Sequence, residues 1–161
     1  MGPLHHYKAT TTWVGNRGRG TAEYKGYDRN HEIRMDGKPV LHCSSDPSFR
    51  GDKTRQNPEE LLVAALSGCH MLWFLHLCSE NGVIVTEYID EASGEMEENA
   101  DGSGQFREVT LRPCVTVLEE SMMSKANGLH HQANQMCFIA RSVKFPVRHE
   151  PMAIVARLKD A

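Results

Sequence analysis

The sequence lacks the local motifs of several common functional classes. It has no Cys-x-x-Cys, which structural zinc sites usually contain, and neither Gly-x-Ser-x-Gly nor a phosphate-binding loop. It also lacks an excess of positive charge, because its 161 residues carry a formal net charge of −3. A nucleic-acid-binding protein usually has a basic surface. We therefore predict no metal site, no cofactor and no nucleic-acid partner.

Features of export and of membrane insertion are also weak. The segment "MGPLHHYKATTT" has no apolar region of the signal-peptide kind. The run 61–78 has no formal charge and reaches the lower limit of a membrane span, but it contains polar residues and is flanked by helix-ending signals. The five cysteines are odd in number and widely spread, which favours free thiols in a reducing compartment. We predict a cytoplasmic protein with no membrane span.

The strongest secondary-structure signal is a long helix that begins after Asn57. Asn57 is a good N-cap, Pro58 suits the first helical position, and two glutamates follow in the first turn. The Asn-Gly pair at 81–82 is a typical helix end. The helix between them is apolar on all sides, so it should be buried on most of them. A domain of this size needs a partner chain to cover such a helix, which favours a dimer.

The rest of the chain predicts strands and two further helices in an α+β fold. Mixed runs of strands and helices are typical of α+β domains rather than of a doubly wound parallel sheet. We predict a single domain over residues 1–161. The expected strands are 6–15, 20–35, 83–97, 106–120 and 152–158, and the expected helices are 121–136 and a short one from Cys137 to 143.

Two cysteines are candidates for chemistry. Cys69 lies twelve residues past Asn57, too far from the helix N-terminus for the helix dipole to activate it. From its position alone, a buried core thiol is therefore the favoured interpretation of Cys69. Cys137 is expected at the start of a short helix, where amide groups favour a thiolate, although packing is again an alternative. The remaining cysteines, at 43, 78 and 114, are predicted to be structural.

The segment "NPEELLVAALSGC", followed 68 residues later by the cysteine of "CFIARSVKFPV", resembles the OsmC/Ohr family of osmotically induced and organic-hydroperoxide-resistance proteins. The resemblance extends over nearly the whole chain, including the element order. It implies an intertwined homodimer, in which antiparallel sheets from both chains are wrapped around two long central helices. Such a dimer would cover a helix that is apolar on all sides.

The resemblance also implies the chemistry of a peroxiredoxin-like thiol peroxidase. Cys69 matches the peroxidatic thiolate and Cys137 the resolving thiol, and Glu59 falls on the glutamate that pairs with a catalytic arginine. A thiolate attacked by peroxide becomes a sulfenic acid, which a second thiol converts to a disulfide before further oxidation. An external dithiol then reduces that disulfide.

The resemblance leaves several arginines open for the catalytic role. The loop "GNRGRG" offers Arg17 and then Arg19, whereas the motif "YDRNH" offers Arg29 and the motif "FRGD" offers Arg50. We favour Arg29, followed by Arg17, and we expect Arg50 to act there or to contact substrate.

Two residues beside the cysteines depart from the family pattern. Phe138 stands where the hydroperoxide branch has proline, and His70 replaces the usual apolar residue next to the helix cysteine. We expect both of them to contact substrate.

The sequence thus predicts a peroxidase whose partners are an organic hydroperoxide, an external dithiol reductant and a second copy of the chain. The alternative is a non-enzymatic OsmC-like stress-related dimer that binds a small apolar ligand. A third and weaker hypothesis is a hydrolase that uses Cys69 and one of the nine histidines.

Overall fold

The computed structural model describes residues 2–156, and the end of the predicted terminal strand lies outside them. The chain divides into two compact units, Met1–Leu62 and Val63–Ala161, called unit 1 and unit 2 below. Their boundary falls in the second turn of the long helix α1 (Pro58–Glu80). The single domain expected over the whole chain stays a prediction.

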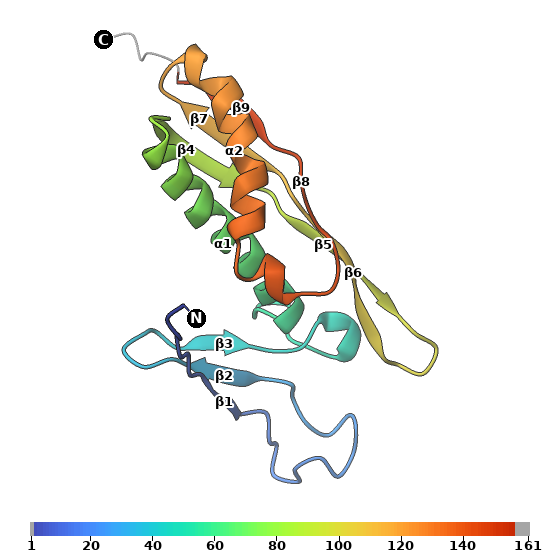
Figure 1. The fold of residues 1–161 in the computed structure, drawn as a ribbon. Helices are drawn as coiled ribbons and strands as arrows, with labels where there is room; N and C mark the ends of the chain where they lie inside the picture. Colours follow the sequence, from blue (N-terminus) through green and yellow to red (C-terminus); the bar gives the residue numbers. More distant parts are fainter. Residues whose placement is uncertain (1, 157–161) are drawn as a thin grey trace, which may run out of the picture. The chain divides into compact units, whose positions relative to one another are not determined.

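Unit 1 contains a three-stranded antiparallel sheet in the order β1-β2-β3 (Figure 1). Its strands are β1 (Thr10–Trp13), β2 (His31–Arg34) and β3 (Leu41–Cys43). The turn between β2 and β3 contains Gly37 at a φ of 68°, a conformation that favours glycine. The predicted strand 20–35 forms only its last part, because residues 14–30 make a long loop instead.

Unit 2 contains two three-stranded sheets and the second α-helix, α2 (Met123–Met136). The sheet orders are β4-β7-β9 and β5-β6-β8. The strands are β4 (Val85–Asp90), β5 (Ser93–Glu98), β6 (Gly104–Leu111), β7 (Pro113–Val117), β8 (Val147–His149) and β9 (Met152–Val155). The mixed α+β class is confirmed. The expected antiparallel pairing holds within unit 1 and for β4-β7 and β5-β6, whereas β6 pairs with β8 and β7 with β9 in parallel.

The two long strands expected at 83–97 and 106–120 are each divided, and their halves join different sheets. The second break falls at Arg112, whose backbone N–H donates at 2.6 Å to the side-chain oxygen Oδ1 of Asp90, the last residue of β4. Pro113 follows and has no N–H, so it suits the first position of a new strand.

Helix α1 begins where the sequence predicts. The Asn57 side-chain oxygen accepts a hydrogen bond from the Glu60 N–H at 2.8 Å, and Glu60 Oε2 accepts one from the Asn57 N–H at 3.1 Å. This reciprocal capping box satisfies two of the donors that a helix start leaves free. Gly82, at a φ of 70°, follows the end of the helix.

The core of unit 2 lies where α1 and α2 pack against the sheet that contains β7. Figure 1 shows the two helices side by side in front of this sheet. The buried side chains come from all three elements: Phe74, Leu77, Cys78, Ala126, Leu129, Ala133, Val115 and Val117. Removing apolar surface of this kind from water stabilises the fold by about 25 cal/mol per Å².

Helix α1 is not covered on every side within this chain. Leu72 keeps 65% of its surface exposed, although His70 and Phe74, two residues to either side of it, are fully buried. By length and composition α1 also meets the criteria for a membrane span, with a mean hydropathy of 1.8. The core helix of a soluble protein meets the same criteria.

Candidate active site

Cys69 and Cys137 lie together in unit 2. Cys69 is half-buried at the start of the fourth turn of α1, and Cys137 is the buried residue that directly follows α2. Burial, together with a hydrogen bond to Cys69, raises the pKa of the Cys137 thiol to about 11. Both are free cysteines in this structure. The arrangement places two thiols within hydrogen-bonding reach at the junction of the two helices.

Cys137 ends α2 and also lies at the start of a short helical turn, although only Ala140–Ser142 of the expected helix 137–143 forms a 3₁₀ turn. Its backbone is extended, with φ −66° and ψ 112°, and its carbonyl oxygen accepts a hydrogen bond from the Arg141 N–H at 3.1 Å. The N–H of Ala140 donates to the Cys137 sulfur at 3.4 Å, which by itself lowers the pKa of the thiol. Burial outweighs this effect, so no dipole-activated thiolate forms here.

An apolar pocket of about 630 Å³ opens beside Cys69. The Trp73 ring meets the Phe138 ring edge to face at 5.6 Å between centroids, and it meets His76 in the same manner at 5.7 Å. Pockets of this size and apolar character are typical of sites for small organic ligands. The lining residues are Ala65, Gly68, Cys69, Leu72, Trp73, His76, Phe138 and Ile139.

The two residues expected to contact substrate are placed differently. Phe138 is 63% exposed and lines this pocket. His70 is fully buried and is absent from the lining, because its ring is turned toward α2, where Nε2 lies 3.0 Å from His130 Nδ1. The structure therefore does not support substrate contact by His70. His76, which the sequence interpretation passed over, lines the pocket instead.

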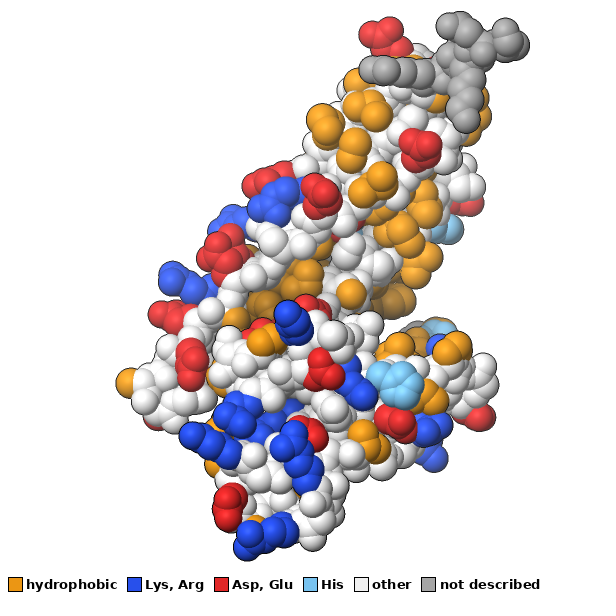
Figure 2. Space-filling view, turned by 180° about the vertical axis from the view of Figure 1, so that it is seen from behind, with side chains coloured by type: hydrophobic (Ala, Val, Ile, Leu, Met, Phe, Trp, Pro, Cys, Tyr) orange, Lys and Arg blue, Asp and Glu red, His pale blue; other side chains and the backbone are white. Residues whose placement is uncertain are grey.

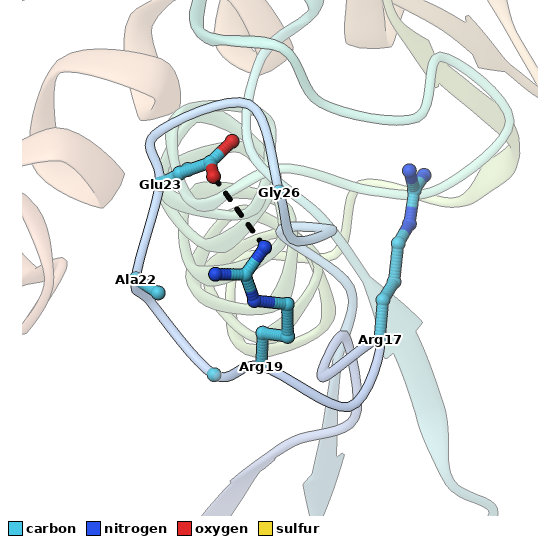
Figure 3. Close-up of a pocket in the computed structure, with 6 residues that line it drawn as sticks. Arg17, Arg19, Ala22, Glu23 and Gly26 are labelled. Atoms are coloured by element: carbon cyan, nitrogen blue, oxygen red, sulfur yellow. Dashed lines mark ion pairs between the residues drawn. The ribbon is translucent and has the colours of Figure 1, made fainter.

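The arginines expected to activate Cys69 all lie in unit 1, and three of them have local partners. Arg17 makes a two-pronged ion pair with Asp28, and its hydrogen bonds hold the pKa of that carboxyl below its usual range. Arg19 turns toward Glu23 at 3.6 Å, while Arg17 points away from this pair (Figure 3).

Arg29 is held between two aromatic rings of the same loop. Its guanidinium lies 4.5 Å from the centre of the Tyr24 ring and 4.1 Å from that of Tyr27. It also donates to the backbone carbonyls of both residues, at 2.8 and 2.7 Å. Such contacts fix the side chain as part of the loop. Arg50 is exposed and has a φ of 67° after a short 3₁₀ turn.

Arg55 is an arginine that the sequence interpretation did not consider. Its side chain is only 27% exposed, and Nε lies 3.4 Å from Asp52 Oδ2. Its Nη1 is buried with no hydrogen-bond partner within residues 2–156, and the same is true of Glu59 Oε2. Buried charged groups usually have partners, so both residues are candidates for a functional contact. The signal for Arg55 was its place two residues before the helix cap.

Within the part of the chain that the structure describes, no group of three or more His, Cys, Asp or Glu side chains is arranged to hold a metal ion. The reactive and binding groups that the described site presents are its two thiols, its apolar walls and the His76 imidazole.

Comparison with known proteins shows a consistent relationship. Residues 51–151 match the family model described as OsmC-like protein. An OsmC-like protein of unknown function from Vibrio cholerae O1 biovar eltor is 31% identical, with a TM-score of 0.84 over 92% of this chain and 100% of that one. An organic hydroperoxide resistance protein from Elizabethkingia anophelis shares the fold, at 16% identity and a TM-score of 0.68 over 97% of this chain and 100% of that one.

An uncharacterized protein of Bacillus subtilis, YmaD, is 22% identical over 144 residues, which cover 87% of each chain. The similarity to these proteins spans most of the chain, and the match to the family model, over residues 51–151, contains the positions of both cysteines.

Proposed function

Because the chain belongs to the OsmC-like protein family, we propose that it is a thiol-dependent peroxidase that reduces organic hydroperoxides and hydrogen peroxide. The observation that carries this proposal is the juxtaposition of Cys69 and Cys137 beside an apolar pocket. The sharing of the fold with an organic hydroperoxide resistance protein supports it. A cytoplasmic location, where thiols stay reduced, suits the same chemistry.

The first step takes place at Cys69, which lines the pocket, whereas Cys137 is buried. The Cys69 thiolate attacks one peroxide oxygen of ROOH, the O–O bond breaks, and RO⁻ leaves to be protonated to the alcohol. Cys69 becomes a sulfenic acid. The organic group of the hydroperoxide is expected to lie against Leu72, Trp73 and Phe138.

The second step joins the two sulfurs. The Cys137 thiol loses its proton to solvent, the thiolate attacks the sulfenic sulfur, the S–O bond breaks, and the departing hydroxide is protonated to water. An external dithiol then reduces the disulfide to two thiols and is itself oxidised to a disulfide. An arginine of unit 1, positioned by Glu59, is proposed to stabilise the thiolate and the leaving oxygen. Arg55 joins Arg29 and Arg17 as a candidate for this role.

The test is one stoichiometric pulse of cumene hydroperoxide, followed by thiol titration and by mass spectrometry of the disulfide. We expect Cys69 and Cys137 to be consumed together, and turnover to be abolished in Cys69→Ser. Cys114→Ser, which changes a half-buried strand thiol, is the matched control and should behave like the native chain. A Cys69→Ser protein that still reduces hydroperoxide at the native rate would refute the proposal.

The pocket also favours a second candidate function, a non-enzymatic dimer that binds a small apolar ligand. Its walls are almost wholly apolar, which suits such a ligand whether or not Cys69 reacts. This function would leave both thiols free after the pulse.

A further inference from the structure

A pair of buried histidines connects the two helices that carry the cysteines. His70 on α1 is fully buried and His130 on α2 is 1% exposed. Their rings are nearly parallel, at an interplanar angle of 6°, and His70 Nε2 lies 3.0 Å from His130 Nδ1. The His130 ring also stacks on Phe74 of α1, at 3.9 Å between ring centroids. The imidazole of His130 therefore contacts two side chains of α1.

Both imidazoles are neutral at neutral pH. Burial lowers the pKa of His70 to about 4 and that of His130 to about 3. A neutral imidazole has one N–H donor and one bare nitrogen, so one ring of the pair donates and the other accepts. Within the described residues, His70 Nδ1 and His130 Nε2 are buried without a hydrogen-bond partner. A shift that broke the bond between the rings would leave two more buried polar atoms unpaired, which is costly.

This bond limits how α2 lies along α1. Phe74 contacts His130 and Cys69 contacts Cys137, so the helices run in opposite directions. A sliding movement by one residue displaces a helix by about 1.5 Å, which apolar contacts tolerate better than a directional hydrogen bond does. The small buried Ala133 lies between His130 and Cys137 on α2 and allows close approach of the helices.

The pair lies close in sequence to the two thiols. His70 directly follows Cys69, and His130 precedes Cys137 by seven residues, which is about two helical turns. Since Cys137 ends α2, its position depends on where that helix lies along α1. A displacement of about 1 Å in reacting groups can slow a reaction about a hundredfold.

We propose that the hydrogen bond between His70 and His130 positions Cys137 for its attack on the Cys69 sulfenic acid. This inference rests on the proposed peroxidase function and deepens it, because it concerns only the disulfide-forming step. Both histidines are positioning residues. The step consumes the Cys137 thiol and the Cys69 sulfenic acid, and it yields one disulfide and one water.

The test removes the hydrogen bond between the histidines in one variant and replaces it with another hydrogen bond in a second variant. His130→Phe keeps an aromatic ring against Phe74 but removes the nitrogen that faces His70. The double variant His70→Gln, His130→Asn places one amide near each nitrogen of the bond, so an amide N–H can donate to the other amide's carbonyl. Because neither amide titrates, recovery in the double variant separates positioning from proton transfer.

The readouts are the rate at which Cys69 loses its thiol and the rate at which the disulfide forms after a cumene hydroperoxide pulse. In His130→Phe we expect Cys69 to be oxidised within about twofold of the native rate, whereas disulfide formation slows about tenfold or more. The delayed sulfenic acid should then be oxidised further to sulfinic acid when hydroperoxide is in excess. The double variant should recover to within about threefold of the native disulfide rate.

Two controls separate positioning from a general loss of stability. His131→Phe changes the exposed neighbour of His130, and Val115→Ala weakens the core at β7 without touching either histidine. Both should form the disulfide at the native rate, even where Val115→Ala lowers the melting temperature as much as His130→Phe does.

Equal disulfide rates in His130→Phe and in the native chain would overturn the inference and leave the peroxidase function standing. If His130→Phe does not fold, the double variant decides the matter. A double variant that folds but forms the disulfide much more slowly than the native chain, while Val115→Ala forms it at the native rate, would equally overturn the inference. No oxidation of Cys69 in the native chain would instead overturn the proposed function itself.

Discussion

At the scale of single residues, the two cysteines of the site differ because their surroundings differ. Cys69 lines an apolar pocket, whereas Cys137 is 1% exposed, and burial raises the pKa of its thiol to about 11. A protonated thiol reacts poorly with peroxide. Under the proposed mechanism Cys137 therefore remains intact during the first oxidation and stays available for the second step.

We expect disulfide formation to become faster as the pH rises. Below a pKa of about 11, the thiolate fraction of Cys137 increases about tenfold per pH unit, and the thiolate is the stronger nucleophile. Stopped-flow measurement of the sulfenic acid between pH 7 and pH 9 should show its decay accelerating about tenfold per unit. Cys137→Ser is the control and should show no such decay to a disulfide. A flat profile in the native chain would mean that the neutral thiol attacks.

The roles of individual residues were predictable only where a motif carries them. "NPEELLVAALSGC" and the later cysteine pointed to Cys69 and Cys137 through a family resemblance, and the structure brings these two thiols together. The contact between His70 and His130 joins residues 60 positions apart, so no local pattern could reveal it. For the same reason, the orientation of His70 toward α2 rather than toward the pocket could not be foreseen.

At the scale of elements, local signals predicted helix α1 well. Its start depends on Asn57 and Glu60, three residues apart, and its end on a glycine with positive φ. The division of the two long strands depends on pairing with distant strands, such as the Asp90 contact to Arg112. Strand β8 has only three residues and pairs in parallel with β6, so the sequence alone gave no sign of it.

The packing of α1 against α2 should make the protein sensitive to acid. Folding holds the pKa of His70 at about 4 and that of His130 at about 3, chiefly through burial, with the charge of His149 lowering both and Asp90 opposing the shift at His70. The unfolded chain, with histidine pKa values near 6.5, binds more protons below that pH. Stability is therefore complete above about pH 6.5 and declines as the pH falls toward 4.

The expected slope is about 1.4 kcal/mol per pH unit for each buried histidine, measured by urea unfolding between pH 7 and pH 4.5. His130→Phe removes one titrating group and should reduce the slope by about half over this range. His131→Phe, at an exposed position, is the matched control and should keep the native slope. Identical slopes for all three proteins would show that the buried pair does not control acid stability.

At the scale of the whole molecule, a single chain leaves much apolar surface uncovered. Figure 2, which is seen from behind, shows hydrophobic side chains on the surface of unit 2. Beside the pocket, Leu72 and Phe138 are each more than 60% exposed. Exposed apolar patches on soluble proteins often mark interfaces. The homodimer implied by the family resemblance would cover α1, and it is our proposal for what meets this surface.

We expect Leu72→Glu to weaken such a dimer strongly. A carboxylate placed in an apolar interface loses its hydration without gaining a partner, which costs several kcal/mol. Light scattering after size-exclusion chromatography should show the native chain at twice its 18.1 kDa mass and Leu72→Glu shifted toward one copy. Ser79→Glu introduces the same charge at an exposed position on the same helix, and it should keep the native mass. A native chain that runs as a monomer at micromolar concentration would contradict the dimer, because an interface that covers a central helix should be large and persistent.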